Sequence, residues 1–189
     1  MSRIDNNHLV KGARGNFSKE FVYRQRGEDT HISRMPRRKK NKVPSEKETN
    51  IRELFLSAVN YAKGAMSSPE LKKEYAKRAN GKNSAYNVAF KDYTKPPVVK
   101  SIDAEKYTGN PASTIAVSAT DDFRVAEVAV RITNAAGVLI EEGNAIQEAI
   151  DRNKWTYTAT KANATLAGTV IRAVAKDLPG HKAELEISV

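Results

Sequence analysis

The residues that could do chemistry in this chain are few and scattered. The sequence has three histidines, His8, His31 and His181, and no cysteine, and none of them stands at the spacing of a metal site. Two adjacent carboxylate pairs, Asp121-Asp122 and Glu141-Glu142, are each expected to be solvated loop pairs, because too few oxygen ligands surround them for calcium. No acid–base pair, nucleophile motif or phosphate-binding loop is found. We therefore predict no enzyme, no metal site and no cofactor.

The chemistry that the chain does offer is positive charge. Its formal net charge is +10, and residues 1–95 hold 22 Lys and Arg against 10 Asp and Glu, whereas residues 96–189 hold 10 against 12. The densest run lies between residues 34 and 42 and contains no acid. Its cations are the predicted contact residues, namely Arg34, Arg37, Arg38, Lys39, Lys40 and Lys42.

Such a run is either a solvated loop or a binding site for an anionic partner, which means nucleic-acid phosphates or an acidic protein surface. No apolar face accompanies the charges, which argues against a membrane surface. The first thirty residues hold no apolar run of signal-peptide length, and no stretch approaches the ~20 apolar residues of a membrane span. We expect cytoplasmic synthesis and no membrane partner.

The elements that position this run follow from residue periodicity. Residues 21–35 alternate about a turn and predict a β-hairpin. After the run, Ser45 and Glu48 form a capping box that opens a long helix with one apolar stripe. On that stripe, Leu54 and Phe55 are expected to lie in the core.

Two shorter helices are predicted next, one beginning at Pro69 and one over residues 84–93. The aromatic residues of the second short helix have two interpretations, a platform for base stacking or a core that holds the hairpin to the helices. The core is the favoured interpretation, because a small domain needs every aromatic it has.

The second half of the chain changes its apolar period from 3.6 residues to two. Pro96-Pro97 separates the halves as an extended linker. Residues 98–189 then contain seven short alternating segments with turn signals between them, the pattern of an antiparallel β-sandwich. Trp155 and Tyr157 are expected in its core, with Trp155 as the large aromatic anchor.

Two resemblances to known families extend this interpretation. The segments NKWTYTAT, GTVIRAVAKDLPG and AELEISV resemble those of bacterial immunoglobulin-like and fibronectin type III domains. The segment GARGNFSKEFVYRQRGEDTHISRMP, followed by a capped helix, resembles an uncharacterised domain family common in Bacteroidota, which brings no known activity. The sandwich resemblance implies a fold and not a function, since sandwich folds carry unrelated roles.

The predicted fold class is therefore a two-domain chain, α+β followed by all-β. Residues 1–95 would form a small basic domain of hairpin and helices, residues 96–97 the linker, and residues 98–189 an antiparallel immunoglobulin-like β-sandwich. This plan is similar to that of phage capsid and tail proteins.

We therefore expect a non-enzymatic structural or assembly protein of a large particle, a phage virion or a phage-like one. Its basic domain would dock on other protein subunits and its sandwich would project. The alternative is a nucleic-acid-binding protein that uses the basic half, and a third option is an adhesin-like surface binding module.

Overall fold

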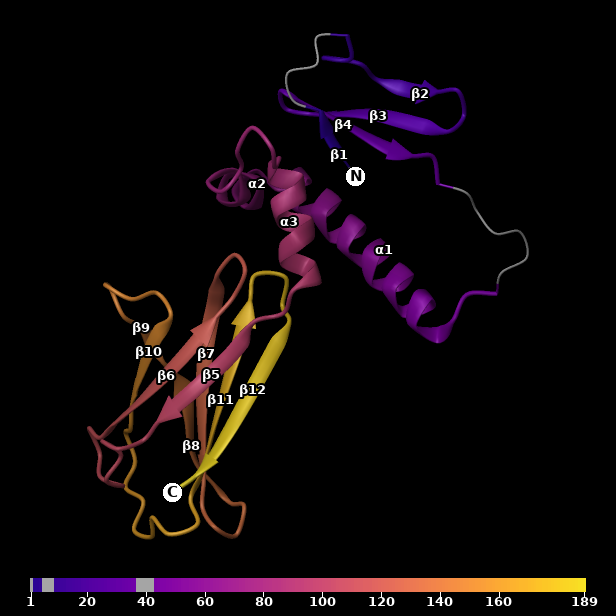
Figure 1. Cartoon of the computed structure of the whole chain (residues 1–189). Coiled ribbons are helices and arrows are strands. Elements are labelled where there is room, and N and C mark those ends of the chain that lie inside the picture. Colours follow the sequence, from indigo (N-terminus) through magenta and orange to yellow (C-terminus); the bar gives the residue numbers. More distant parts are fainter. Residues whose placement is uncertain (1, 5–8, 37–42) are drawn as a thin grey trace.

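The computed structural model describes residues 2–4, 9–36 and 43–189, which form three antiparallel sheets of four strands each and three helices (Figure 1). The chain is thus a mixed α+β protein. Within those ranges, every helix is too short or too polar to cross a membrane.

The first sheet contains the predicted hairpin and two strands that were not predicted. Its strands are β1 (Ser2–Ile4), β2 (Gly15–Phe17), β3 (Phe21–Arg26) and β4 (Asp29–Arg34), in the order β1-β4-β3-β2. The β3–β4 turn passes through Gly27 with φ +62°, a conformation that favours glycine. The two additional strands are three residues long each, too short for an alternating pattern to reveal them.

The helices begin where the sequence predicts them. They are α1 (Glu46–Ser67), α2 (Pro69–Ala76) and α3 (Ala85–Thr94). At the start of α1, Ser45 Oγ accepts a hydrogen bond from the Glu48 amide at 3.3 Å, and Glu48 Oε2 accepts one from the Ser45 amide at 3.0 Å. The predicted capping box is confirmed.

Only the second half of α1 is packed. Its buried residues are Ala58, Ala62 and Ala65, which lie in a small core with Tyr75 of α2 and Ala89 of α3. The reason is length: α1 has 22 residues and spans about 33 Å, whereas α3 has 10 residues and spans about 15 Å. The shorter helices end before they reach the beginning of α1.

The prediction that Leu54 and Phe55 lie in the core is therefore wrong. Leu54 is 43% exposed and Phe55 is 58% exposed. Phe55 keeps one edge contact, with the ring of Phe90 at a centroid distance of 5.1 Å. The helical period was right, but among the described residues α3 reaches that part of the stripe only at its edge, through Phe90.

The other two sheets face each other across one core and form a β-sandwich. One has the order β5-β6-β10-β9 and the other the order β12-β11-β7-β8. The strands are β5 (Val98–Asp103), β6 (Thr114–Thr120), β7 (Val125–Thr133), β8 (Leu139–Asn144), β9 (Ile146–Gln147), β10 (Lys154–Thr158), β11 (Val170–Asp177) and β12 (Lys182–Ser188).

Alternate residues of both sheets fill this core. Val117 from one sheet and Val130 and Ile171 from the other are almost completely buried. Trp155 and Tyr157 of β10 lie in the same core, with 6% and 5% of their surfaces exposed. The period of two predicted the strand interiors because one face of each strand is buried.

The helices meet the sandwich at one end of its sheets. Lys95 is extended with φ −129°, as its position before a proline requires, but the side chain of Pro97 is fully buried, so the connector is packed. Phe123 and Leu178 from loops of the sandwich pack against the helical core. The C-terminus lies at the opposite end of the sandwich (Figure 1).

Trp155→Ala should lower the free energy of unfolding by about 3–5 kcal/mol, because it removes a large ring from the shared core. Urea unfolding followed by circular dichroism measures it. Lys154→Ala is the matched control, since this neighbour is exposed and its loss should cost less than about 0.5 kcal/mol. A loss below about 1 kcal/mol for the tryptophan variant would contradict its place in the core.

Candidate functional site

Most of the predicted basic contact run cannot be placed. Arg37, Arg38, Lys39, Lys40 and Lys42 lie outside the described residues. The remaining member of the run is Arg34, which the structure describes. It is exposed at the end of β4, pairs in register with Phe21, and lines a shallow hollow with Glu20, Phe21 and Met35.

The first sheet has one aromatic face and one basic face. Phe17 pairs with Phe21, and Tyr23 pairs with Ile32, so these side chains share a face. Phe17 is 61% exposed and its ring lies 6.3 Å from that of Tyr23. The alternate positions of the hairpin form the other face, with Arg24, Arg26 and His31.

This sheet has no apolar core of its own. Of residues 9–36 and 43–57, Thr30 alone is buried, and its hydroxyl oxygen accepts hydrogen bonds from the Gly12 amide and the Gln25 side chain, both at 3.1 Å. An ion pair of 3.8 Å between Lys82 and Asp29 joins the sheet to the loop after α2. The sheet is held by its backbone ladder and by polar contacts.

The exposed part of α1 continues the same apolar face that is buried further along. Ile51, Leu54 and Phe55 lie at helical spacing with Ala58, the first buried residue. Ile51 is 65% exposed. We call Ile51, Leu54 and Phe55 the α1 stripe, and the stripe together with the aromatic face of the first sheet the amino-terminal surface.

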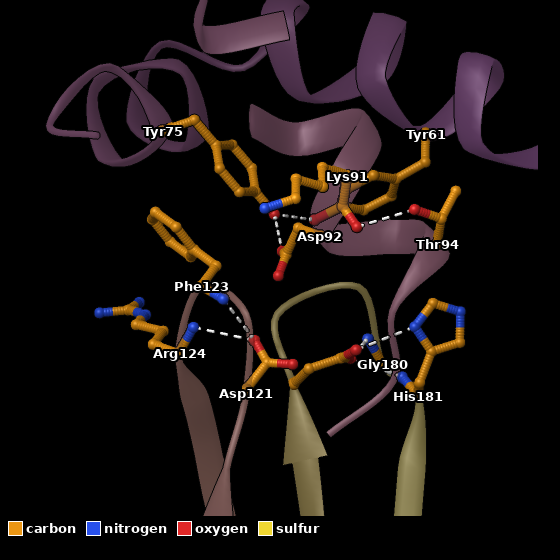
Figure 2. A network of polar contacts seen from close by, with 11 residues as sticks. Tyr61, Tyr75, Lys91, Asp92, Thr94, Asp121, Phe123, Arg124, Gly180 and His181 are labelled. Atoms are coloured by element: carbon orange, nitrogen blue, oxygen red, sulfur yellow. Dashed lines mark hydrogen bonds and ion pairs between the residues drawn. The ribbon is translucent and has the colours of Figure 1, made fainter. Parts of the chain in front are cut away.

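A second candidate site is a buried polar network where the helices meet the sandwich (Figure 2). Tyr75 of α2 donates a hydrogen bond of 2.6 Å to Asp92 Oδ2 of α3. The hydroxyl groups of Tyr61 and Tyr75 lie 2.7 Å apart, so Tyr61 of α1 donates to the Tyr75 oxygen. One chain of hydrogen bonds thus joins all three helices, and both Tyr75 and Asp92 are fully buried.

Two carboxylates of the sandwich face this network. Asp121 Oδ2 accepts hydrogen bonds of 2.9 Å from the amides of Phe123 and Arg124. Asp177 accepts from the amides of Gly180 and His181, at 2.7 and 2.6 Å, and its other oxygen lies 2.9 Å from His181 Nδ1. The loops that carry both acids are therefore fixed by the acids themselves.

The remaining oxygens of Asp92 and Asp121 are the unsatisfied part of this network. Both Oδ1 atoms are buried and have no hydrogen-bond partner among the described residues. A proton on Asp92 would remove one buried negative charge and would give Asp92 a donor of its own.

Burial raises the pKa of Asp92 from 3.8 to about 7, although the hydrogen bond from Tyr75 lowers it. The nearby carboxylates of Asp121 and Asp177 raise it further. Burial also raises the pKa of Tyr75, and the hydrogen bond that Tyr75 donates to Asp92 acts in the same direction. The proton of Asp92 therefore titrates near neutral pH while the tyrosines keep theirs.

The expectation that Asp121-Asp122 is a solvated pair is wrong. Asp121 belongs to the buried network, and Asp122 forms ion pairs of 2.9 and 3.0 Å with Lys91 and Lys95 of α3. Although partial burial opposes them, these two ammonium groups hold the pKa of Asp122 below its usual value. The two ion pairs of Asp122 thus link the loop before β7 to α3.

Glu141 also differs from the prediction. It is only 4% exposed, and its Oε2 accepts hydrogen bonds from the Thr160 amide and hydroxyl, both at 2.9 Å, and from the Lys161 amide at 3.2 Å. It stabilises a turn after β10. Within the ranges that the structure describes, no group of three His, Cys, Asp or Glu is arranged to hold a metal ion.

Comparison with known proteins adds little to these observations. No family model and no curated protein matches the chain, so the resemblance to a Bacteroidota family has no support beyond the quoted residues. Among solved structures, the chain is similar to CopC from Methylosinus trichosporium OB3b at 16% identity and a TM-score of 0.36. This match covers 48% of the chain and 87% of that protein. A likeness at this score carries no argument about function.

Asp92→Asn should change how stability depends on pH. A carboxyl group whose pKa is raised in the folded state binds more protons folded than unfolded, so its stabilising contribution is complete below about pH 4 and is lost as the pH rises through about 7. The asparagine amide keeps the hydrogen bonds of the protonated acid and cannot titrate. The variant should therefore gain stability relative to wild type from pH 5 to 7, by up to about 1.4 kcal/mol per pH unit.

Urea unfolding at pH 5, 6, 7 and 8 measures this difference. Asp122→Asn is the control, because the lowered pKa of Asp122 places its titration below this range. Parallel pH profiles for wild type and Asp92→Asn would show that Asp92 is already ionised at pH 5.

Proposed function

We propose that this protein is a non-enzymatic structural subunit of a large particle such as a phage virion. In this proposal the amino-terminal surface docks on another protein subunit of the particle, and the sandwich projects from it. The observation that carries the proposal is that two features of the amino-terminal half are uncovered: a sheet without a core, and a helix whose apolar stripe is only half covered.

The first sheet needs another element, or a partner protein, packed against its apolar face. Small sheets become stable when a hydrophobic face packs against another element, and the first sheet has only Thr30 buried in its described part. Each large apolar side chain of the α1 stripe would gain about 1.5–3 kcal/mol on full burial. A partner that covers both features at once would therefore complete the fold of the amino-terminal half.

The chemistry of the surface favours a protein with an acidic rim as that partner. Residues 1–95 carry 22 Lys and Arg against 10 Asp and Glu, so an acidic surface complements them. Nucleic-acid phosphates would meet the cations but would leave Ile51 and Leu54 exposed to water. The α1 stripe also continues the face that already packs at Ala58, so a protein surface can extend existing helix packing.

The sandwich supports the projecting role. Its strand orders, β5-β6-β10-β9 and β12-β11-β7-β8, correspond to the ABED and GFCC′ sheets of immunoglobulin-like domains. We therefore propose an immunoglobulin-like unit over residues 98–189, following a docking unit over residues 1–95 and the connector at 96–97. Its free end carries the C-terminus, away from the helices (Figure 1).

The triple variant Ile51→Ser, Leu54→Ser and Phe55→Ser tests the docking role. Wild-type protein, tagged and expressed in its natural host, should sediment with large particles in a density gradient. The triple variant should be at least tenfold depleted there, because it removes the apolar contact without touching a buried residue. Its circular dichroism should stay close to that of wild type.

Arg52→Ser with Asn60→Ser is the matched control, since both side chains are exposed polar positions on the same helix. It should enter particles as wild type does. Wild-type protein that remains entirely in low-mass fractions would overturn the proposal, and equal incorporation of the triple variant would remove the α1 stripe from it.

The basic run has its own test. Changing Arg37, Arg38, Lys39 and Lys40 together to Ser should alter the free energy of unfolding by less than about 1 kcal/mol, as surface substitutions do. Incorporation into particles should fall at least tenfold, because arginine and lysine together supply the charge that complements an acidic partner. Unchanged incorporation would identify the run as a solvated loop.

A second candidate function is binding of single-stranded nucleic acid, favoured by the aromatic face of the first sheet. Phe17 and Tyr23 are rings on which bases could stack, and Arg34 lies on the same face. Fluorescence anisotropy with a labelled single-stranded DNA distinguishes the two functions. Binding that weakens with salt by a log–log slope of about 0.7 per phosphate, and that Phe17→Ala abolishes, would favour the nucleic acid.

A further inference from the structure

A cleft of about 600 Å³ lies between α2 and the sandwich. Its helical wall carries Glu74, Lys77 and Arg78, at the end of α2 and just beyond it. Its sandwich wall carries Arg124 at the start of β7 and Arg152 before β10, with Trp155 beside them. Two units of the chain thus contribute to one cleft, and a ligand there would contact both.

The cleft has more positive than negative charge. Four cations line it against two acids, Glu74 and Asp121, which leaves a net charge of +2. Glu74 is shared between Lys77, at 2.5 Å, and Arg124, at 3.7 Å. Asp121 accepts hydrogen bonds from the backbone amides of Phe123 and Arg124, and it forms no ion pair with a cation of the cleft among the described residues.

Arg78 and Arg152 form no ion pair with an acid among the described residues. Arg78 donates to the backbone carbonyl of Asp122 and lies over the Phe123 ring at 5.4 Å, contacts that do not neutralise a guanidinium. Arg152 is exposed, and its side chain has no ion pair within the described part of the chain. Among residues 2–4, 9–36 and 43–189, the ion-pair partner of Arg124 is the shared Glu74, at the long distance of 3.7 Å. A guanidinium group without a close carboxylate partner is suited to bind an oxyanion in a bidentate manner.

An unused hydrogen-bond donor belongs to the same cleft. Trp155 is 6% exposed, and its indole Nε1 is buried without an acceptor among the described residues. A buried donor left without a partner costs about 1–3 kcal/mol, so such groups in native proteins usually find an acceptor. Because this nitrogen is closed to solvent, an oxygen atom of a bound ligand reaches it only when the side chains that cover it move aside.

We propose that this cleft binds the phosphate group of a small molecule. The phosphate oxygens accept hydrogen bonds from Arg124 and Arg152 and from the indole N–H of Trp155. A phosphate monoester carries about −1.5 to −2 charges near neutral pH, which matches the net charge of the lining. The volume exceeds that of phosphate alone and suits a small phosphorylated molecule.

This site has a structural consequence that the docking proposal does not include. A ligand that bridges α2 and the sandwich binds only while the two are together, so it stabilises their junction by mass action. Binding is therefore measurable as a rise in the unfolding temperature of the full-length protein, without knowledge of the natural ligand.

The test uses inorganic phosphate as the probe, at constant ionic strength maintained with sodium chloride. Wild-type protein should show a saturable rise in Tm with phosphate, and isothermal titration calorimetry should give the same Kd. The double variant Arg124→Gln and Arg152→Gln should bind at least tenfold more weakly. Both positions are exposed, so the variant should fold like wild type. Lys100→Gln with Lys106→Gln is the matched control, since it removes two exposed cations outside the cleft and should bind as wild type does.

Trp155→Phe examines the indole N–H while a ring remains in the core, and it should weaken phosphate binding several-fold. If that variant unfolds, the arginine variant still decides the question. A rise in Tm that sodium chloride reproduces, or one that the arginine variant retains, would overturn the site. The docking proposal rests on the α1 stripe, which lies outside the cleft, so loss of phosphate binding in the arginine variant leaves that proposal intact.

Discussion

The hydrogen bond from Tyr75 to Asp92 is the contact on which the packing of the three helices at the end of the sandwich depends. It is 2.6 Å long and fully buried, and Tyr61 extends it so that all three helices share one polar chain. Phe123 from the sandwich packs on the Tyr75 ring at 4.7 Å, and the carboxylates of Asp121 and Asp177 face Asp92. Burial raises the pKa of Asp92 to about 7, so below that pH a proton, rather than a cation, neutralises this buried carboxyl group.

Packing is unevenly distributed along the chain. From Ala58 onward, the helical core and the sandwich core follow each other and meet at Phe123 and Leu178. Before Ala58, polar contacts and a backbone ladder hold the described residues together, with Thr30 as their buried member. Local opening should therefore begin in the first sheet and the start of α1, which is where a docking surface benefits from adaptability.

Much of the fold could be predicted from the sequence, because its signals are local. The Ser45 and Glu48 capping box depends on residues three apart, and the strands of the sandwich show their period over a few residues. The exposure of Phe55 could not be predicted in this way. It depends on where α3 ends in space relative to α1, which the periodicity of α1 does not contain.

The buried network was missed for a related reason. Asp92 and Asp121 are 29 positions apart, and each alone resembles an ordinary surface acid. One signal was available: Asp92 stands between Phe90 and Tyr93 on a short helix, an uncommon place for a solvated acid. The arginines of the cleft gave no such signal, since Arg78, Arg124 and Arg152 come from three separate loops or element ends that only the folded chain brings together.

The length of α1 also fixes an angle. Its exposed stripe and its buried face lie on one uninterrupted helix, so the direction in which Phe55 points is set by the direction in which Ala58 and Ala62 point. One residue inserted between Phe55 and Ala58 would turn the stripe by about 100° around the helix axis and would separate Phe55 from Phe90, while Ala58 and Ala62 kept their positions in the core. The helix α1 therefore determines how the sandwich is oriented relative to a partner that binds the α1 stripe.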